Sequence, residues 1–214
     1  MRPLMLLLPL AVALASCGEK TALTLPADPV DRAATCGVVA AASAREASAS
    51  VEAPLTFEEQ QRIVHYAMLA GAESESFAQD RAAAVAERMS TIESGITGGE
   101  WSVLVEPCRA AFPAARPTDA IALPDDPLES QFGCFMLADF LTTALRSQEA
   151  DYGAELRGYE AMQRSLDARL GRTLAARGAM SMAQTQEARA QALATMVKLG
   201  PPDQVMQVCL ERYS

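Results

Sequence analysis

The positions of four cysteines indicate that most of this chain consists of two halves with a similar layout. Cys36 and Cys134 each begin a Cys-x-apolar-apolar-Ala pattern, and Cys108 and Cys209 each lie four residues before an aromatic side chain. Cys108 follows Cys36 after 72 positions, and Cys209 follows Cys134 after 75 positions. Because recurrence at a fixed period is typical of duplicated units, the sequence predicts an internal duplication of a unit of about 75 residues.

The residues between these cysteines favour helices. Half of the chain is apolar but only 5% is aromatic, and the apolar residues are mainly Ala, Leu, Val and Met. Ala and Leu are strong helix formers, whereas strands are enriched in β-branched and aromatic residues. We therefore expect an all-α fold of two tandem four-helix units, residues 29–112 and 127–214.

Capping signals predict where these helices begin. An Asp-Pro pair at 28–29 and another at 126–127 place a capping carboxylate before a proline at the first helical position. Capping-box patterns begin at Thr56, Thr97 and Ser181. The expected helices span about 29–48, 56–70, 74–94, 101–112 with a kink at Pro107, 127–149, 153–174 and 181–200, with a short last helix after the prolines at 201–202.

The two units are separated by a proline-rich segment. Residues 113–126 contain Pro113, Pro117 and Pro124 among small and acidic residues, and Pro127 follows at once. Since proline lacks a backbone donor and restricts the residue before it, this segment is predicted to be a linker.

The N-terminus has the features of an export signal. Arg2 precedes a 12-residue apolar run from Leu4 to Ala15, which is too short to span a bilayer as a helix. The run ends in Leu14-Ala15-Ser16-Cys17. This ending resembles the lipobox of bacterial lipoproteins, in which the signal peptide is cut before the cysteine and its sulfur receives diacylglycerol. Cleavage after Ala15 by ordinary secretory processing also fits the small-x-small pattern.

Cysteine parity favours the lipoprotein. Five cysteines are an odd number for an exported protein, but four can pair if Cys17 carries lipid. The resemblance implies a signal peptide over 1–16 and a lipidated tether over 17–28, with the body on the periplasmic side of the envelope. Because Gly18 stands where Asp would resemble an inner-membrane retention signal, the outer membrane is favoured.

The remaining cysteines can pair in three ways, which the sequence alone does not separate. A bridge inherited by both copies of a duplicated unit would give Cys36–Cys108 and Cys134–Cys209. Each bridge would join the first helix of a unit to its last and stabilise the fold by about 4 kcal/mol in the chain-entropy model.

The sequence carries no recognised catalytic, cofactor or metal motif, so we expect no cofactor and no metal. The cysteines lack CxxC-type pairs. His65 is the one histidine, and we expect it at the surface or in a groove rather than in catalysis. The formal net charge of −9 and the absence of a basic cluster argue against nucleic-acid binding.

These features predict a membrane-anchored periplasmic lipoprotein with a binding, adaptor or structural role, acting on another envelope protein. A groove between tandem helical units is a common place for a partner helix. Two other classes remain open. One is an enzyme, hydrolase-like, with an unrecognised site near His65, although the sequence favours a non-enzyme. The other is an inhibitor or immunity protein whose acidic first half binds a basic secreted enzyme.

Overall fold

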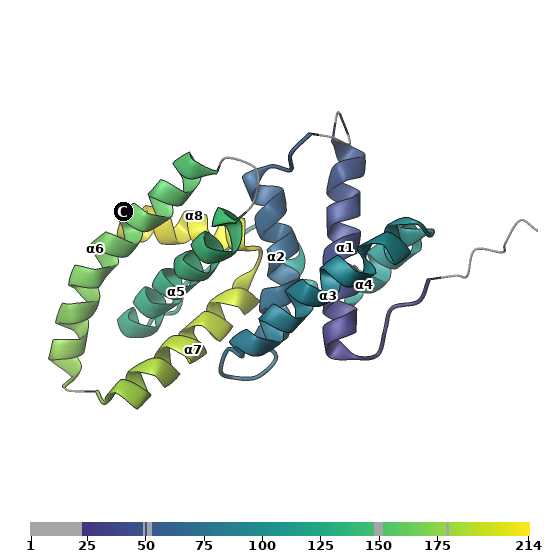
Figure 1. The fold of residues 1–214 in the computed structure, drawn as a ribbon. Helices are drawn as coiled ribbons and strands as arrows, with labels where there is room; N and C mark the ends of the chain where they lie inside the picture. Colours follow the sequence, from purple (N-terminus) through teal and green to yellow (C-terminus); the bar gives the residue numbers. More distant parts are fainter. Residues whose placement is uncertain (1–22, 49, 51–52, 148–151, 179) are drawn as a thin grey trace, which may run out of the picture.

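The computed structural model describes residues 23–48, 50, 53–147, 152–178 and 180–214. Over these ranges the chain is all-helical, with eight α-helices, two short 3₁₀ helices and no strand. Figure 1 shows their arrangement. The elements are α1 (Pro29–Ala47), α2 (Phe57–Gly71), α3 (Gln79–Thr97), η1 (Trp101–Leu104), α4 (Val105–Ala111), η2 (Pro113–Ala115), α5 (Pro127–Arg146), α6 (Gly153–Arg177), α7 (Met182–Leu199) and α8 (Pro202–Tyr213).

In the first half, α1 packs against both α2 and α3, and η1 and α4 lie against α1. Asp28 caps α1, because its carboxylate accepts hydrogen bonds from the backbone N–H groups of Val30 and Asp31. The core of this half is built from small and aliphatic side chains, among them Ala34, Val39, Val85 and Leu104. Small residues on α1 allow its neighbours to approach closely.

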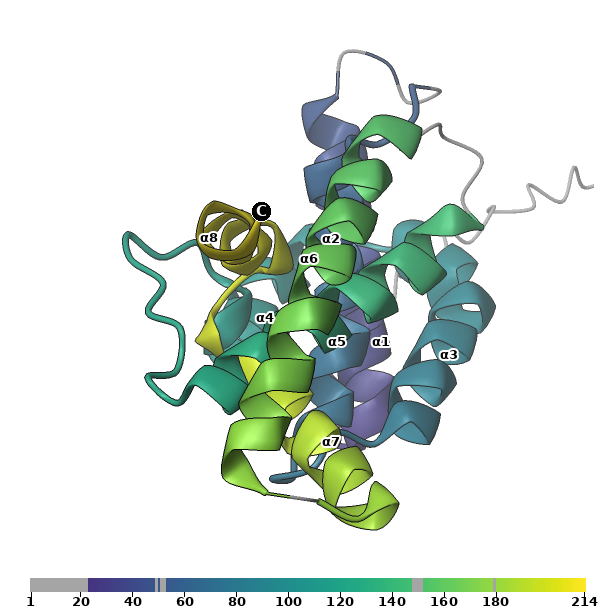
Figure 2. The same ribbon diagram turned by 90° about the vertical axis from the view of Figure 1, so that its left-hand side faces the viewer.

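In the second half, α5 packs against α6 and α7, and α8 contacts both α5 and α6. Asp126 caps α5 as Asp28 caps α1, because its carboxylate accepts hydrogen bonds from the backbone N–H groups of Leu128 and Glu129. Phe132, Leu137, Met162 and Met196 are among the buried residues of its core. The two views agree that α6 lies on the outer side of this half, away from α1 (Figures 1 and 2).

Helix α2 lies between the halves and is buried on several sides. It packs on α1 and α3 and also contacts α5, α7 and α8 (Figure 1). Met68 and Ala72 belong to the core of the second half, whereas Ala67 and Ala70 belong to that of the first. One helix therefore contributes to both cores and fixes one half against the other.

Both expected disulfides are present. Cys36 of α1 is bonded to Cys108 of α4, and Cys134 of α5 is bonded to Cys209 of α8, with Cα–Cα distances of 5.4 and 5.6 Å. All four side chains are buried. Each bridge joins the first helix of its half to the last helix.

Two local expectations are wrong. The capping box predicted at Thr97 does not form, because α3 continues through Thr97, whose hydroxyl donates to the Glu93 carbonyl. The helix predicted over 101–112 divides into η1 and α4, with Pro107 in the first turn of α4. Proline is tolerated in a first turn because those N–H groups have no intrahelical acceptor.

None of the helices in the described part of the chain is long and apolar enough to cross a membrane.

Candidate functional site

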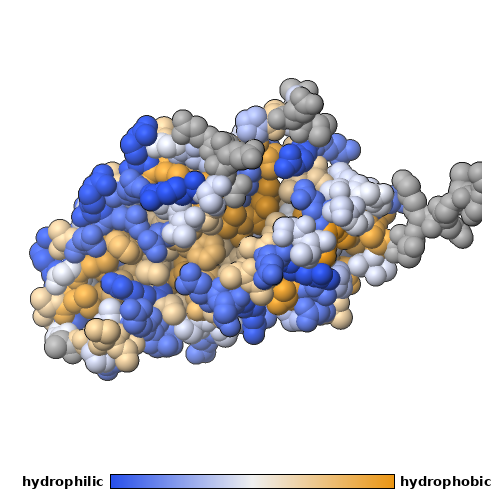
Figure 3. All heavy atoms as spheres, in the orientation of Figure 1, coloured by the Kyte–Doolittle hydropathy of each residue, from blue (hydrophilic) through white to orange (hydrophobic). Residues whose placement is uncertain are grey.

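A groove of about 610 Å³ runs between the two halves. Helices α1, α2 and α3 of the first half form most of its wall, and α5 closes the other side. We call it the central groove, and its lining includes Val38, Ala41, Arg45, Leu55, Gln60, Ile63, Val64, Ala67, Ala82, Ala83, Ala86, Met89, Glu93, Met136, Asp139, Phe140, Thr143, Ala144 and Leu193. Figure 3 shows apolar residues gathered over the middle of this face. The volume lies in the range of about 300–1,000 Å³ that ligand pockets have.

Alanines form much of the apolar lining of the central groove; Ala67 and Ala82 are buried, and Ala83 and Ala86 are exposed. Ala41, Ala67, Ala82, Ala83 and Ala86 come from three different helices and line one continuous surface. A helix packed on another needs an axis separation of about 8–10 Å, and small side chains at the contact allow the shorter end of that range. The small side chains of this lining therefore leave room for a further helix to pack closely.

Charged residues of both signs lie along the central groove. Arg45 comes from α1, Glu93 from α3 and Asp139 from α5. None of these three side chains forms an ion pair within the described residues, whereas other arginines such as Arg81 and Arg88 do. Their charges are available to a bound partner.

His65 lies in the interior, so the expectation of a surface or groove histidine is wrong. The side chain is fully buried on α2, and Nε2 lies 2.8 Å from the Val197 carbonyl oxygen of α7. Its Nδ1 atom has no hydrogen-bond partner among the residues that the structure describes. Burial lowers the pKa of His65 from 6.5 to about 4, and the Val197 carbonyl and Asp203 oppose that shift. The imidazole is neutral at ordinary pH and does not line the central groove.

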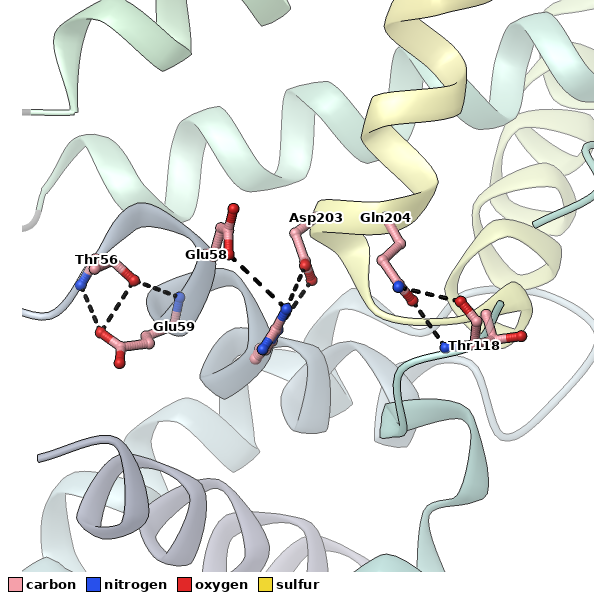
Figure 4. Close-up of polar contacts among 7 residues, drawn as sticks. Thr56, Glu58, Glu59, Thr118, Asp203 and Gln204 are labelled. Atoms are coloured by element: carbon pink, nitrogen blue, oxygen red, sulfur yellow. Dashed lines mark hydrogen bonds and ion pairs between the residues drawn. The ribbon is translucent and has the colours of Figure 1, made fainter. Parts of the chain in front are cut away.

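Polar side-chain contacts also join α8 to α2 and to the segment between the halves. Arg62 of α2 donates through Nε and Nη2 to both carboxylate oxygens of Asp203, at 3.3 and 2.8 Å, and Gln204 hydrogen-bonds the backbone of Thr118 (Figure 4). The hydrogen bond with Asp203 raises the pKa of Arg62 above its ordinary value. The first turn of α8 is thereby fixed both to α2 and to the segment that joins the halves.

Two tyrosines of the second half donate to the first half. The Tyr159 hydroxyl donates to Gln61 Oε1, and the Tyr152 hydroxyl donates to the Leu55 carbonyl, both at 2.9 Å. Burial raises the pKa of both phenols, so they stay protonated donors. The junction is therefore a specific polar interface rather than an apolar contact alone.

The sequence-predicted site residues do not gather at the central groove. Cys36, Cys108, Cys134 and Cys209 form the disulfides and do not line it, and Cys17 lies outside the described residues. In the part of the chain that is described, no three His, Cys, Asp or Glu side chains are placed to hold a metal ion.

The groove residues themselves were missed by sequence reasoning. Arg45 lies near the end of α1 and Asp139 in the middle of α5, and nothing in the spacing indicates that the two helices face the same cavity. The sequence contained only a general indication of a groove, because tandem helical units often leave one between them.

No family model, no curated protein and no solved structure matches this chain.

Proposed function

We propose that this chain is a lipid-anchored protein of the bacterial envelope that binds an amphipathic helix of another envelope protein in the central groove. The observation that supports it best is the groove itself: its lining is rich in alanine and includes Arg45, Glu93 and Asp139, which form no ion pair within the described residues. An amphipathic helix presents an apolar stripe flanked by charges, which matches that layout.

The choice of a helix over a small apolar ligand rests on charge. A fatty acid carries one charge at one end, whereas the groove has an unpaired cation on one wall and unpaired carboxylates on two others. A helix that carries both signs beside its apolar stripe can pair with all three. Such pairs at the edge of an interface contribute mainly to specificity and to the rate of association.

Photo-crosslinking in intact cells tests this proposal. A photoreactive residue placed at Ala83 or Ala86 in the central groove should yield the same protein adduct, and the labelled peptide should be an amphipathic helical segment. Ala168, an exposed alanine on α6, is the matched control position and should yield none of it. Arg45→Glu should weaken the adduct because it reverses a charge on the groove wall. Equal labelling at Ala168, or a lipid adduct at Ala83, would contradict a helix-binding groove.

The anchor is a separate part of the proposal. The lipobox at Leu14–Cys17 supports removal of residues 1–16 and lipidation of Cys17, which would hold the body at the membrane, the outer one being favoured. Mass spectrometry of the native protein should find diacylglycerol on Cys17 as the first residue. Cys17→Ser should release the protein from the membrane fraction, and an intact Met1 would contradict the proposal.

We also propose that the two halves descend from one duplicated unit. Both begin with an Asp-Pro pair whose Asp caps the first helix and lies eight residues before a disulfide cysteine. In both, the first helix packs against the second and third. When the two halves of an experimental structure are superposed, Cys36 should coincide with Cys134 and, in the same superposition, Cys108 with Cys209. A superposition that aligns one cysteine pair but not the other would contradict common descent.

A further inference from the structure

A second cavity, of about 370 Å³, lies against the first half on a different set of helix faces. It is bordered by α1, α2, α4 and the residues that follow α4, and shares only Ile63 with the central groove. We call it the arginine cavity; its lining is Val39, Ala40, Ser43, Ala44, Glu59, Arg62, Ile63, Tyr66, Val105, Cys108, Arg109, Phe112, Ala115, Arg116 and Pro117.

Three arginines from three elements border this cavity, in a chain whose formal net charge is −9. The one carboxylate in the lining, Glu59, accepts two hydrogen bonds from Thr56 in the capping box of α2. Arg62 and Arg109 are paired with the carboxylates of Asp203 and Glu106 just outside the lining, whereas Arg116 forms no ion pair within the described residues.

Each guanidinium is held on one side and has N–H groups left over. Arg116 donates through Nε and Nη2 to the Arg109 carbonyl, which leaves Nη1 without a partner in the described residues. Arg109 uses Nη1 to bind Glu106, which leaves Nε and Nη2. Arg62 uses Nε and Nη2 for Asp203. Arg116, whose guanidinium is oriented by two hydrogen bonds to a backbone carbonyl, can bind phosphate or carboxylate at a lower cost in conformational entropy.

The rest of the lining is apolar except for Ser43, whose hydroxyl donates to the Val39 carbonyl, and Tyr66. Tyr66 packs edge-on against Phe112, with ring centroids 5.4 Å apart, and its hydroxyl has no hydrogen-bond partner among the described residues. Burial raises the pKa of Tyr66, so the phenol remains a donor. Val39 and Ala40 of α1 complete the apolar wall.

We propose that the arginine cavity binds a small amphiphilic anion, with a phosphate or carboxylate group at Arg109 and Arg116 and an apolar body against Val39 and Phe112. The ligand is a soluble organic anion or the headgroup region of an anionic lipid, which share this chemistry. The proposal does not depend on the helix-binding role of the central groove.

Calorimetric titration of the purified full-length chain in neutral detergent tests the site. Phenyl phosphate should bind saturably and more tightly than inorganic phosphate, which lacks an apolar body. Arg109→Gln with Arg116→Gln should weaken phenyl phosphate at least tenfold. Arg81→Gln is the matched control, because Arg81 is similarly exposed and ion-paired but lies on α3 outside the cavity, and it should leave binding unchanged. Circular dichroism should show that all variants remain folded.

Short-chain lipids distinguish the two sources. Tighter binding of dihexanoyl phosphatidylglycerol than of phenyl phosphate, lost in the double variant, would identify a lipid headgroup, and the reverse order would identify a soluble anion. Phosphatidylcholine should bind weakly in either case because it has no net charge. Absence of saturable binding by every anionic probe, or equal binding by the double variant, would overturn the proposal. Equal affinity for inorganic and phenyl phosphate would overturn the apolar part of it.

Discussion

The Nε2 atom of His65 lies 2.8 Å from the carbonyl oxygen of Val197, in the interior between the two halves. A backbone carbonyl can only accept, so the imidazole carries its proton on Nε2 and donates it to Val197. Nδ1 is then an acceptor without a partner. Protonating Nδ1 would place a charge in a fully buried position with no carboxylate directly bonded to it.

We expect His65 to make the protein less stable as the pH falls from about 6.5 to about 4. The folded-state pKa of about 4 lies below the ordinary 6.5, so between these values the unfolded chain binds a proton that the folded chain does not. The contribution lost over this interval is about 3 kcal/mol, and no more is lost below pH 4, where both states are protonated. Urea unfolding at a series of pH values measures it.

His65→Gln is the control for that measurement, because its side-chain amide can still donate to Val197. Carboxylates titrate in both proteins, so the informative quantity is the difference in slope between wild type and variant. The variant should lose stability less steeply between pH 6.5 and 4. Parallel curves would show that His65 is not buried as a neutral side chain.

Each disulfide should contribute about 4 kcal/mol, because each closes a loop of more than seventy residues in the unfolded chain. Cys36→Ala with Cys108→Ala, and separately Cys134→Ala with Cys209→Ala, should lower the free energy of unfolding by similar amounts. Urea unfolding in the absence of reductant measures the loss. A non-reducing peptide map that links Cys36 to Cys134 would contradict both the pairing and the expected equality.

Local signals in the sequence were sufficient for most of the helix starts. Asp28, Thr56, Asp126 and Ser181 each accept a backbone hydrogen bond within three residues, so capping depends on nothing distant. Thr97 has the same pattern but is the last residue of α3, where its hydroxyl donates to the Glu93 carbonyl instead of accepting from a following N–H group. The cysteine pairing was predicted from a hypothesis of duplication, in which a bridge within one unit is inherited by both copies.

Features that depend on how the halves meet were not predictable. Val64-His65-Tyr66 gives no indication that α7 covers His65, since Val197 is 132 residues away. The central groove likewise depends on α5 lying opposite α3, and the Arg62–Asp203 pair spans 141 residues. Periodicity identifies the apolar face of a helix but not the element that packs on it.

Arg62→Ala should lower the free energy of unfolding more than the same substitution at an exposed arginine. The Asp203 side chain is only 10% exposed, so Arg62→Ala leaves a largely buried carboxylate without its bidentate partner, at about 1–3 kcal/mol. Arg109→Ala removes an exposed pair with Glu106 and should cost less than about 1 kcal/mol. Thermal unfolding compares the two variants. A double variant with Asp203→Asn should be less destabilised than the sum of the single variants, and simple additivity would show that the two side chains do not interact.

Substitution of glycine by alanine should have opposite effects in α5 and α6. A Cβ atom at Gly133 would lie within 3 Å of Met196 Cγ and Sδ and 3.4 Å from the Ala192 carbonyl oxygen, so α5 and α7 would have to separate. Such overpacking costs about 1–3 kcal/mol. Gly158 and Gly171 of α6 have no atom within 4 Å of that position, so alanine there should stabilise the helix by about 0.5–1 kcal/mol by reducing the freedom of the unfolded chain.

Gly37 gives the intermediate case. Its nearest neighbours are the terminal Cε and Sδ atoms of Met89, which can move aside because they end a flexible side chain. The free energy of unfolding measured with urea should therefore be lowest for Gly133→Ala, intermediate for Gly37→Ala and highest for Gly158→Ala. If Gly133→Ala were as stable as Gly158→Ala, α5 and α7 could not be in the close contact that forms the core of the second half.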